Sequence, residues 1–114
     1  MSEEDKIEEY LWERESSGKK HPELTREREH FETLKKCMGS FVGFYFRWNP
    51  TKLYQYPYQI NGKALEISQG KILKAIPIEF RSRTFGLRLP GIVFEAMNKR
   101  QYIVRLNNIK EIII

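Results

Sequence analysis

The spacing of hydrophobic residues changes once along this chain, at Gly39. Over residues 2–16 and 22–38 apolar side chains recur at helical spacing, whereas from Phe41 onward they alternate with polar ones, as is typical of β strands. The 114 residues suffice for one domain. The pattern therefore predicts an α+β fold, with a helical arm over residues 1–38 and a β domain over residues 39–114.

Both expected helices carry signals at their ends. Ser2 is a suitable N-cap for the first helix, and Asp5 follows it at the spacing of a capping box. Pro22 suits the first position of the second helix, and Gly39 suits the residue that follows its end. The apolar stripe of the first helix is narrow, so we expect this helix to dock on a larger body.

After Phe41 the alternation predicts short strands separated by turns. Asn61-Gly62 is the strongest hairpin signal and predicts pairing of Ile60 with Lys63. Pro57 lies inside an expected strand, which predicts an edge strand or a bulge there, and Pro77 predicts a break in the strand over residues 72–81. Other turns are expected at Ser68-Gln69-Gly70, Pro90-Gly91 and Asn98-Lys99-Arg100. The expected strands cover residues 41–48, 54–60, 63–67, 72–81, 84–89, 92–97, 101–106 and 109–114.

The last residues run from a strand through a polar step, Asn107-Asn108, into a short apolar strand. This order resembles the end of SH3-like and Sm-like small barrels, in which a short 3₁₀ turn joins the last two strands. The resemblance covers residues 102–114 only and implies no functional residues. Together with the many short strands, it predicts two N-terminal helices followed by a small antiparallel SH3-like or Sm-like β barrel. An open, curled antiparallel sheet of five or six strands is the alternative.

Charge divides where the spacing changes. Residues 1–38 hold 8 Lys/Arg and 11 Asp/Glu, a net charge of −3, and residues 39–114 hold 12 and 4, a net charge of +8; together they give +5. Eight aromatic residues fall within residues 41–58. A basic β domain rich in aromatic residues favours a polyanion as its partner.

Most cations of the β domain lie in turns or out of phase with the apolar residues, so we expect them on the surface: Arg47, Lys52, Lys74, Arg81, Arg83, Arg88, Lys99, Arg100 and Arg105. Binding of single-stranded nucleic acid needs cations along the backbone and flat side chains on which bases stack. We therefore predict a surface for DNA or RNA built from Tyr45, Arg47, Lys52, Tyr54, Tyr56, Arg81, Arg83, Arg88, Lys99, Arg100 and Arg105. The alternative is that the tyrosines form a core face and the cations only keep a small domain soluble.

Two other kinds of partner fit the same sequence. The chain can act as a protein–protein adaptor or inhibitor that docks an acidic protein, with charge steering the encounter. It can also form a homo-oligomer through its apolar last strand, residues 109–114. The acidic helical arm is either a solvated helical face or a mask over the basic surface.

No motif predicts catalysis. Cys37, His21 and His30 are too few and too scattered for a zinc site, and Asp5 is the only aspartate, which argues against magnesium-dependent phosphoryl chemistry. Residues 39–43 lack the Lys-Ser/Thr ending of a phosphate-binding loop. We expect a protein that is not an enzyme and that needs no metal or cofactor.

Residues 2–9 are acidic, unlike the basic start of a signal peptide, and no apolar run approaches the length of a membrane span. The sequence therefore predicts a soluble, cytoplasmic protein without a membrane partner.

Overall fold

A computed structural model describes residues 2–18, 21–48, 50–51, 53–56, 69–81 and 86–114. This part of the chain confirms the α+β class, and none of its helices is long and apolar enough to cross a membrane. Its elements are α1 (Glu3–Ser16), α2 (Pro22–Cys37), β1 (Phe41–Phe46), β2 (Tyr54–Gln55), β3 (Gln69–Arg81), β4 (Gly86–Ala96), β5 (Gln101–Arg105), the 3₁₀ helix η1 (Leu106–Asn108) and β6 (Ile109–Ile113).

The helices begin and end close to where their signals predict. The Ser2 hydroxyl accepts a hydrogen bond from the Asp5 amide at 3.1 Å, and the Ser2 amide donates to the Asp5 carboxylate at 3.3 Å, which confirms the capping box. Pro22 is the first residue of α2. Gly39 follows α2 with φ of +83°, and its amide donates to the carbonyl of Ile72 at 2.9 Å. This bond ties the end of α2 to the sheet.

Arg28 joins the two helices through carboxylates. Its guanidinium donates to Glu8 at 2.8 Å, to Glu15 at 2.6 Å and to Glu32 at 3.1 Å. Lys35 adds a contact to Glu32 at 3.1 Å, and the bonds from Lys35 and then Arg28 lower the pKa of Glu32. Three carboxylates of the acidic arm are thus bound to cations of the helix pair itself.

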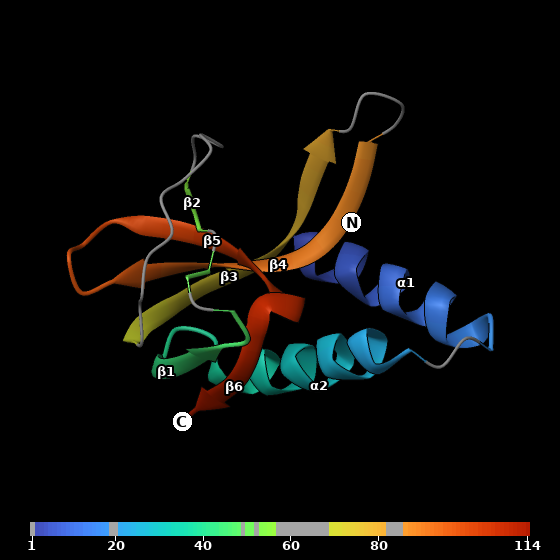
Figure 1. Ribbon diagram of the computed structural model, residues 1–114, viewed down its shortest axis with the longest axis horizontal. Helices are drawn as coiled ribbons and strands as arrows, with labels where there is room; N and C mark the ends of the chain where they lie inside the picture. Colours follow the sequence, from blue (N-terminus) through green and yellow to red (C-terminus); the bar gives the residue numbers. More distant parts are fainter. Residues whose placement is uncertain (1, 19–20, 49, 52, 57–68, 82–85) are drawn as a thin grey trace.

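The six strands form one antiparallel sheet in the order β2-β5-β4-β3-β1-β6 (Figure 1). Its two edge strands, β2 and β6, do not pair with each other in the described ranges, so the sheet is open. The predicted barrel is therefore not confirmed, and the alternative of an open sheet fits. Figure 1 shows α1 and α2 side by side against one side of this sheet.

The end of the chain follows the expected order of strand, 3₁₀ helix and strand. β6 pairs with β1 within the chain, with Phe44 opposite Ile112. The buried Asn107 of η1 accepts hydrogen bonds at 3.0 Å from both Arg26 and Arg47. The His30 ring lies 2.7 Å from the carbonyl of Ile109, and burial lowers the pKa of this imidazole. These contacts hold η1 and β6 against α2 and β1.

Three predicted irregularities are absent, because β3 and β4 form one long hairpin. Gln69 and Gly70 belong to β3 and do not form a turn, and β3 runs through Pro77 without a break. Pro90 lies inside β4, directly opposite Pro77. Neither β1 nor β5 pairs with the hairpin at Pro77 and Pro90, so the hairpin is a two-stranded ribbon there. A proline nitrogen on the open side of such a ribbon removes no hydrogen bond between the strands.

Gly91 is required for close packing and does not form a turn. A Cβ atom at this position would lie 2.0 Å from Cδ1 of Ile78 and 2.8 Å from the carbonyl oxygen of Val104. The absence of a side chain at Gly91 lets the Ile78 side chain pack directly against the backbone of β4. The Pro-Gly pair therefore marks a crowded place in the hairpin, where sequence reasoning expected a turn.

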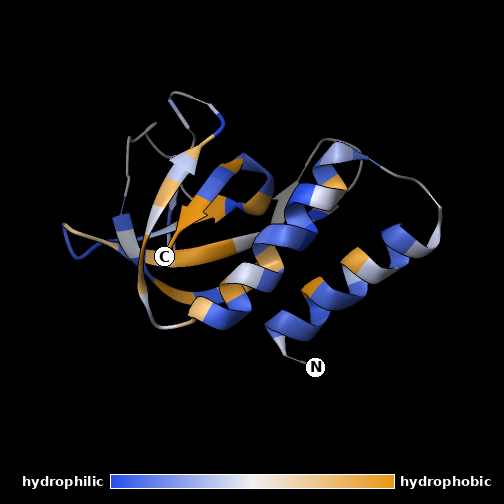
Figure 2. Cartoon of the chain, turned by 90° about the horizontal axis from the view of Figure 1, so that it is seen from below, coloured by the Kyte–Doolittle hydropathy of each residue, from blue (hydrophilic) through white to orange (hydrophobic). Residues whose placement is uncertain are grey.

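Apolar residues pack on both faces of the sheet. The main core joins the helices to the sheet through residues such as Leu11, Phe31, Phe44 and Phe94. A smaller outer core lies apart from the helices and consists of Ile76, Ile78, Val93 and Ile103. Figure 2 shows mostly hydrophilic helices with isolated hydrophobic positions, and strands with longer hydrophobic stretches.

Two strand predictions differ from the structure or lie outside it. β1 ends at Phe46, two residues earlier than expected, and Trp48 is 58 % exposed instead of continuing the buried face. β2 is confirmed over Tyr54–Gln55, while the Asn61-Gly62 hairpin lies outside the described residues.

Candidate nucleic-acid interface

The turn between β4 and β5 presents two adjacent cations. The Ala96 amide donates to the Arg100 carbonyl at 3.0 Å, and the Asn98 side chain accepts from the Arg100 amide at 3.0 Å, so the turn is held from both sides. Lys99 adopts φ of +68°, where glycine or asparagine is the easier residue. Lys99 and Arg100 are both exposed, as predicted.

The start of β3 adds two more cations beside this turn. The register places Gly70 opposite Ala96 and Lys71 opposite Glu95, so β3 begins where β4 ends. Lys71 and Lys74 are exposed on either side of a register shift between Ile72 and Lys74. Lys74 pairs with a residue of the outer core, Val93, which places its side chain on the face of the sheet opposite the main core.

Two tyrosines from the β2 region complete the cluster. The Tyr56 amide donates to the Gln101 carbonyl at 3.0 Å, which places this residue next to the β4–β5 turn. The ammonium of Lys74 donates to the Tyr56 hydroxyl at 2.8 Å and lies 4.8 Å from the ring centroid. Tyr54 pairs with Ile103, and both rings pack on the outer core while staying partly exposed.

We call these residues the turn-end surface: Lys71, Lys74, Lys99, Arg100, Tyr54 and Tyr56. In the described part of the chain none of its four cations makes an ion pair. One carboxylate, Glu95, lies opposite Lys71 in the ladder. Four positive charges thus share a small area with two partly exposed rings.

The turn-end surface contains four of the predicted interface residues. Lys74 is exposed as expected, although sequence reasoning left it out of the interface. Lys71 escaped attention because it lies next to the expected turn at Ser68-Gln69-Gly70. Only the register of β3 against β4 brings Lys71 to the same end of the sheet as Arg100 and Lys99, with β4 between them.

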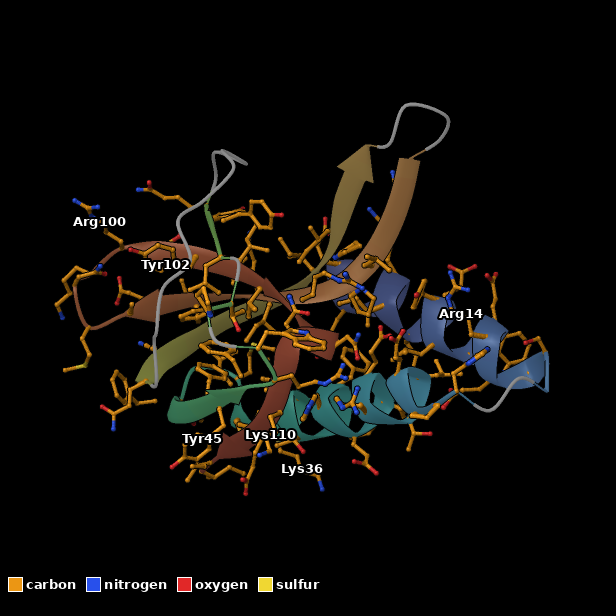
Figure 3. All side chains as sticks on the ribbon, in the orientation of Figure 1. Arg14, Lys36, Tyr45, Arg100, Tyr102 and Lys110 are labelled. Carbon is orange, nitrogen blue, oxygen red and sulfur yellow. The ribbon has the colours of Figure 1, made fainter. Side chains whose placement is uncertain are left out.

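The other predicted residues lie elsewhere. Tyr45 of β1 is 54 % exposed. The guanidinium of Arg47 donates to the carbonyl of Asn107 at 3.2 Å and lies 5.2 Å from the Trp48 ring, so much of its bonding capacity serves the fold. Figure 3 shows Tyr45 along the lower edge and Arg100 at the turn end.

Arg88 and Arg105 are also separate from the turn end. Arg88 is exposed and lines a hollow with Lys6, Tyr10 and other residues of α1. Arg105 is half-buried; burial raises the pKa of both Tyr10 and Glu27, and the charge of Arg105 opposes that rise. Both cations therefore lie near the helices.

Three predicted positions lie wholly or partly outside the described residues. Lys52 and Arg83 lie outside the described residues. The backbone of Arg81 pairs with Gly86 in the hairpin, but its side chain is outside the described set. The contribution of Lys52, Arg81 and Arg83 to the predicted interface therefore stays a prediction.

A second surface feature lies on β1. Phe41 and Tyr45, each 54 % exposed, flank Gly43, and Ile113 and Gln69 are the residues opposite Gly43 on the neighbouring strands. These residues line a groove of about 380 Å³, which we call the edge groove. It adjoins β6, the last strand of the sheet.

The described residues hold no group of three or more His, Cys, Asp or Glu side chains that could bind a metal ion. Cys37 is buried, in keeping with its interpretation as a small apolar core residue. Comparison of the chain with protein-family models, curated proteins and solved structures finds no match.

Proposed function

We propose that this chain is a non-enzymatic nucleic-acid-binding protein that holds a single-stranded segment on the turn-end surface. The observation that carries the proposal is the gathering of Lys71, Lys74, Lys99 and Arg100 around Tyr54 and Tyr56. Cations attract the phosphates, and partly exposed rings offer bases a surface on which to stack.

The packing beneath the rings supports this proposal. Tyr54 and Tyr56 rest on Ile76, Val93 and Ile103, so they lose little further freedom when a base stacks on them. The ammonium of Lys74 is held beside the Tyr56 ring and can meet a phosphate next to a stacked base. A single strand suits such a platform, since its bases are free to leave their stack.

Fluorescence anisotropy tests the proposal with labelled 20-nucleotide DNA, RNA and duplex DNA at 50 and 200 mM salt. Affinity should fall steeply between the two salt concentrations. The double variant Lys71→Glu, Lys74→Glu should lose at least tenfold in affinity for single strands. Because each lost phosphate contact lowers the salt slope by about 0.7, removal of two should lower it by about 1.4.

The matched control is Lys6→Glu with Lys36→Glu, which changes the net charge equally through exposed helix residues. It should lose much less affinity than the turn-end variant. No binding at micromolar protein, or equal losses in both variants, would contradict the proposal.

The edge groove favours a second candidate, a protein partner. Its occupant would be an extended segment with apolar side chains flanked by Asp or Glu. Phe41, Tyr45 and Ile113 offer the apolar contacts, and Lys71 lies opposite Phe41 with Lys110 exposed on β6. β6 pairs only with β1 in the described ranges, so its other edge can accept a strand.

Selection from a random peptide library tests this candidate. Peptides rich in apolar and acidic residues should be enriched on the native chain and lost on Phe41→Ala, Tyr45→Ala. Equal enrichment on both proteins would contradict it. Light scattering at several concentrations separates this case from pairing of β6 with a second copy, which stays a prediction.

A further inference from the structure

A cavity lies between the end of α1 and the start of α2, far from the turn-end surface. It measures about 480 Å³. Figure 3 shows Arg14, one of its lining residues, at the end of the molecule opposite Arg100. We call it the corner cavity; its lining residues are Tyr10, Glu13, Arg14, Ser17, His21, Glu23, Leu24 and Glu27.

Glu27 is the unusual member of this lining. Only 7 % of the residue is exposed, yet within the described residues its carboxylate has no hydrogen bond and no ion pair. The carboxylate oxygens are not fully enclosed by protein, so they are accessible from the cavity and can accept hydrogen bonds from a molecule inside it. Because Glu27 lines the cavity, a molecule inside that cavity can reach it.

The cations around Glu27 act on it from a distance. Burial raises the pKa of Glu27 to about 7, the charge of Glu23 adds to that rise, and Arg105, Arg14 and Arg26 oppose it. Arg26 donates to Asn107 at 3.0 Å, and the Arg14 guanidinium lies 4.2 Å from the Tyr10 ring centroid. These two cations are therefore engaged with other groups.

The remaining walls add negative charge. Glu13 and Glu23 line the cavity from α1 and α2 and are both exposed, and Arg14 is the only cation in the described lining. No three acidic, His or Cys side chains of the described part converge on a point where a metal ion could sit. A ligand with several positive charges spaced along a chain fits separated carboxylates better than a single ion does.

We propose that the corner cavity binds a small aliphatic polyamine, with one ammonium group donating to the Glu27 carboxylate and a second near Glu13 or Glu23. The methylene chain of such a ligand would lie against Leu24 and the Tyr10 ring, the apolar part of the lining. The ammonium groups of such a ligand thus contact the carboxylates of the lining, and its methylene chain contacts the apolar residues.

Binding couples to the release of a proton. The ammonium groups stay charged near neutral pH, whereas Glu27 has to ionise to pair with one of them, so its proton passes to the buffer. Affinity should therefore rise as pH increases from 6 to 8. The groups that face Glu27 are Tyr10, Glu13 and Arg14 from α1, Glu23 and Arg26 from α2, His21 before α2, and Arg105 from β5.

Isothermal titration calorimetry with spermidine tests the proposal. At pH 6 the native chain should bind and release up to one proton, measured as a different heat in phosphate and in imidazole buffer. Glu27→Gln should lose at least tenfold in affinity together with the proton release. Glu29→Gln, an exposed position on the same helix, should change neither.

Magnesium chloride at matched ionic strength serves as the control for general attraction to acidic residues. Circular dichroism checks that Glu27→Gln is folded, and Glu23→Gln gives a second variant at an exposed site, expected to lose about threefold. Absence of binding by the native chain, equal binding by Glu27→Gln, or binding without proton release at pH 6 would each overturn the proposal.

Discussion

The helix pair and the turn-end surface differ in how their charged side chains are arranged. Between α1 and α2, Arg28 contacts Glu8, Glu15 and Glu32, so opposite charges meet. At the turn end Lys71, Lys74, Lys99 and Arg100 share one end of the sheet, with Glu95 as the acidic neighbour of Lys71 in the ladder. Paired charges in the first region serve packing, and like charges in the second are mildly unfavourable until an anion binds.

This difference sharpens the meaning of the charge division in the sequence. The negative arm does not simply cover the positive domain, because three of its carboxylates are bound within the helix pair. The positive domain is not basic throughout, since Arg47 and Arg105 lie partly buried near η1 and the helices. The net charges of −3 and +8 therefore overstate how much of the acidic arm can cover the β domain, and how many cations of that domain lie on its surface.

The largest effect is expected from Phe31→Ala. This substitution tests whether the helix pair and the sheet that carries the turn-end surface unfold as one unit. Phe31 is 1 % exposed in a core that the helices share with the sheet. Its truncation should lower the free energy of unfolding by about 3–5 kcal/mol. Urea unfolding should still give one transition by both tryptophan fluorescence and circular dichroism.

Trp12→Ala is the control for that change, because Trp12 is 63 % exposed on α1. It should alter the free energy of unfolding by less than about 0.5 kcal/mol. Separate transitions for helix and sheet signals would instead show that the regions unfold independently.

Glu27→Gln should stabilise the chain at pH 8 and have little effect at pH 4. The folded pKa of about 7 lies above the usual value of 4.5, so the contribution of Glu27 to stability is fully present below pH 4.5 and is lost as pH rises through 7. The gain at pH 8 should be at most roughly 3 kcal/mol. Thermal unfolding at both pH values measures it, and a gain of equal size at pH 4 would contradict the assignment.

Arg28→Met should lower the free energy of unfolding by about 1–2 kcal/mol at low salt, and by less at 0.5 M salt. Its guanidinium is largely shielded and contacts three carboxylates, which exceeds the usual value of one exposed pair. Lys36→Met, at an exposed position of the same helix, should have almost no effect. Equal changes in the free energy of unfolding of the two variants would show that the ion pairs of Arg28 do not stabilise the helix pair.

The smallest change in stability is expected from Lys99→Gly at the turn end. Lys99 has φ of +68°, so glycine relieves strain while adding freedom to the unfolded chain. The free energy of unfolding should rise by less than about 1 kcal/mol, while affinity for single-stranded nucleic acid falls. A stability loss above 1 kcal/mol would show that Lys99 supports the turn itself.

Much of the local structure could be predicted, because its signals lie within a few residues of each other. Ser2 and Asp5 predict the start of α1, and Pro22 and Gly39 predict the two ends of α2. The order of strand, 3₁₀ helix and strand at the end of the chain was also predicted, as was the Asn98-Lys99-Arg100 turn. Each feature depends on backbone preferences that act over one or two turns of chain.

Pro90-Gly91 shows where such reasoning fails. The pair is a turn signal when read alone, but both residues lie inside β4, where Ile78 and Val104 leave no room for a side chain at position 91. Because this long hairpin was not predicted, Lys71 was not included in the interface; the register of β3 and β4 brings it to the same end of the sheet as Arg100. Sequence reasoning thus found part of the turn-end surface but not the strand that completes it.

The sequence by itself determined the two helices, the change to strands at Gly39 and the division of charge, because composition and local backbone preference are properties of short segments. Only the tertiary structure decided that the sheet is open, which cations gather at the turn end and that Glu27 lies largely buried in the lining of the corner cavity. These outcomes depend on contacts such as Arg26 with Asn107, 81 residues apart. The burial and pairing of a charge depend on which distant elements pack against it, and no short segment contains that information.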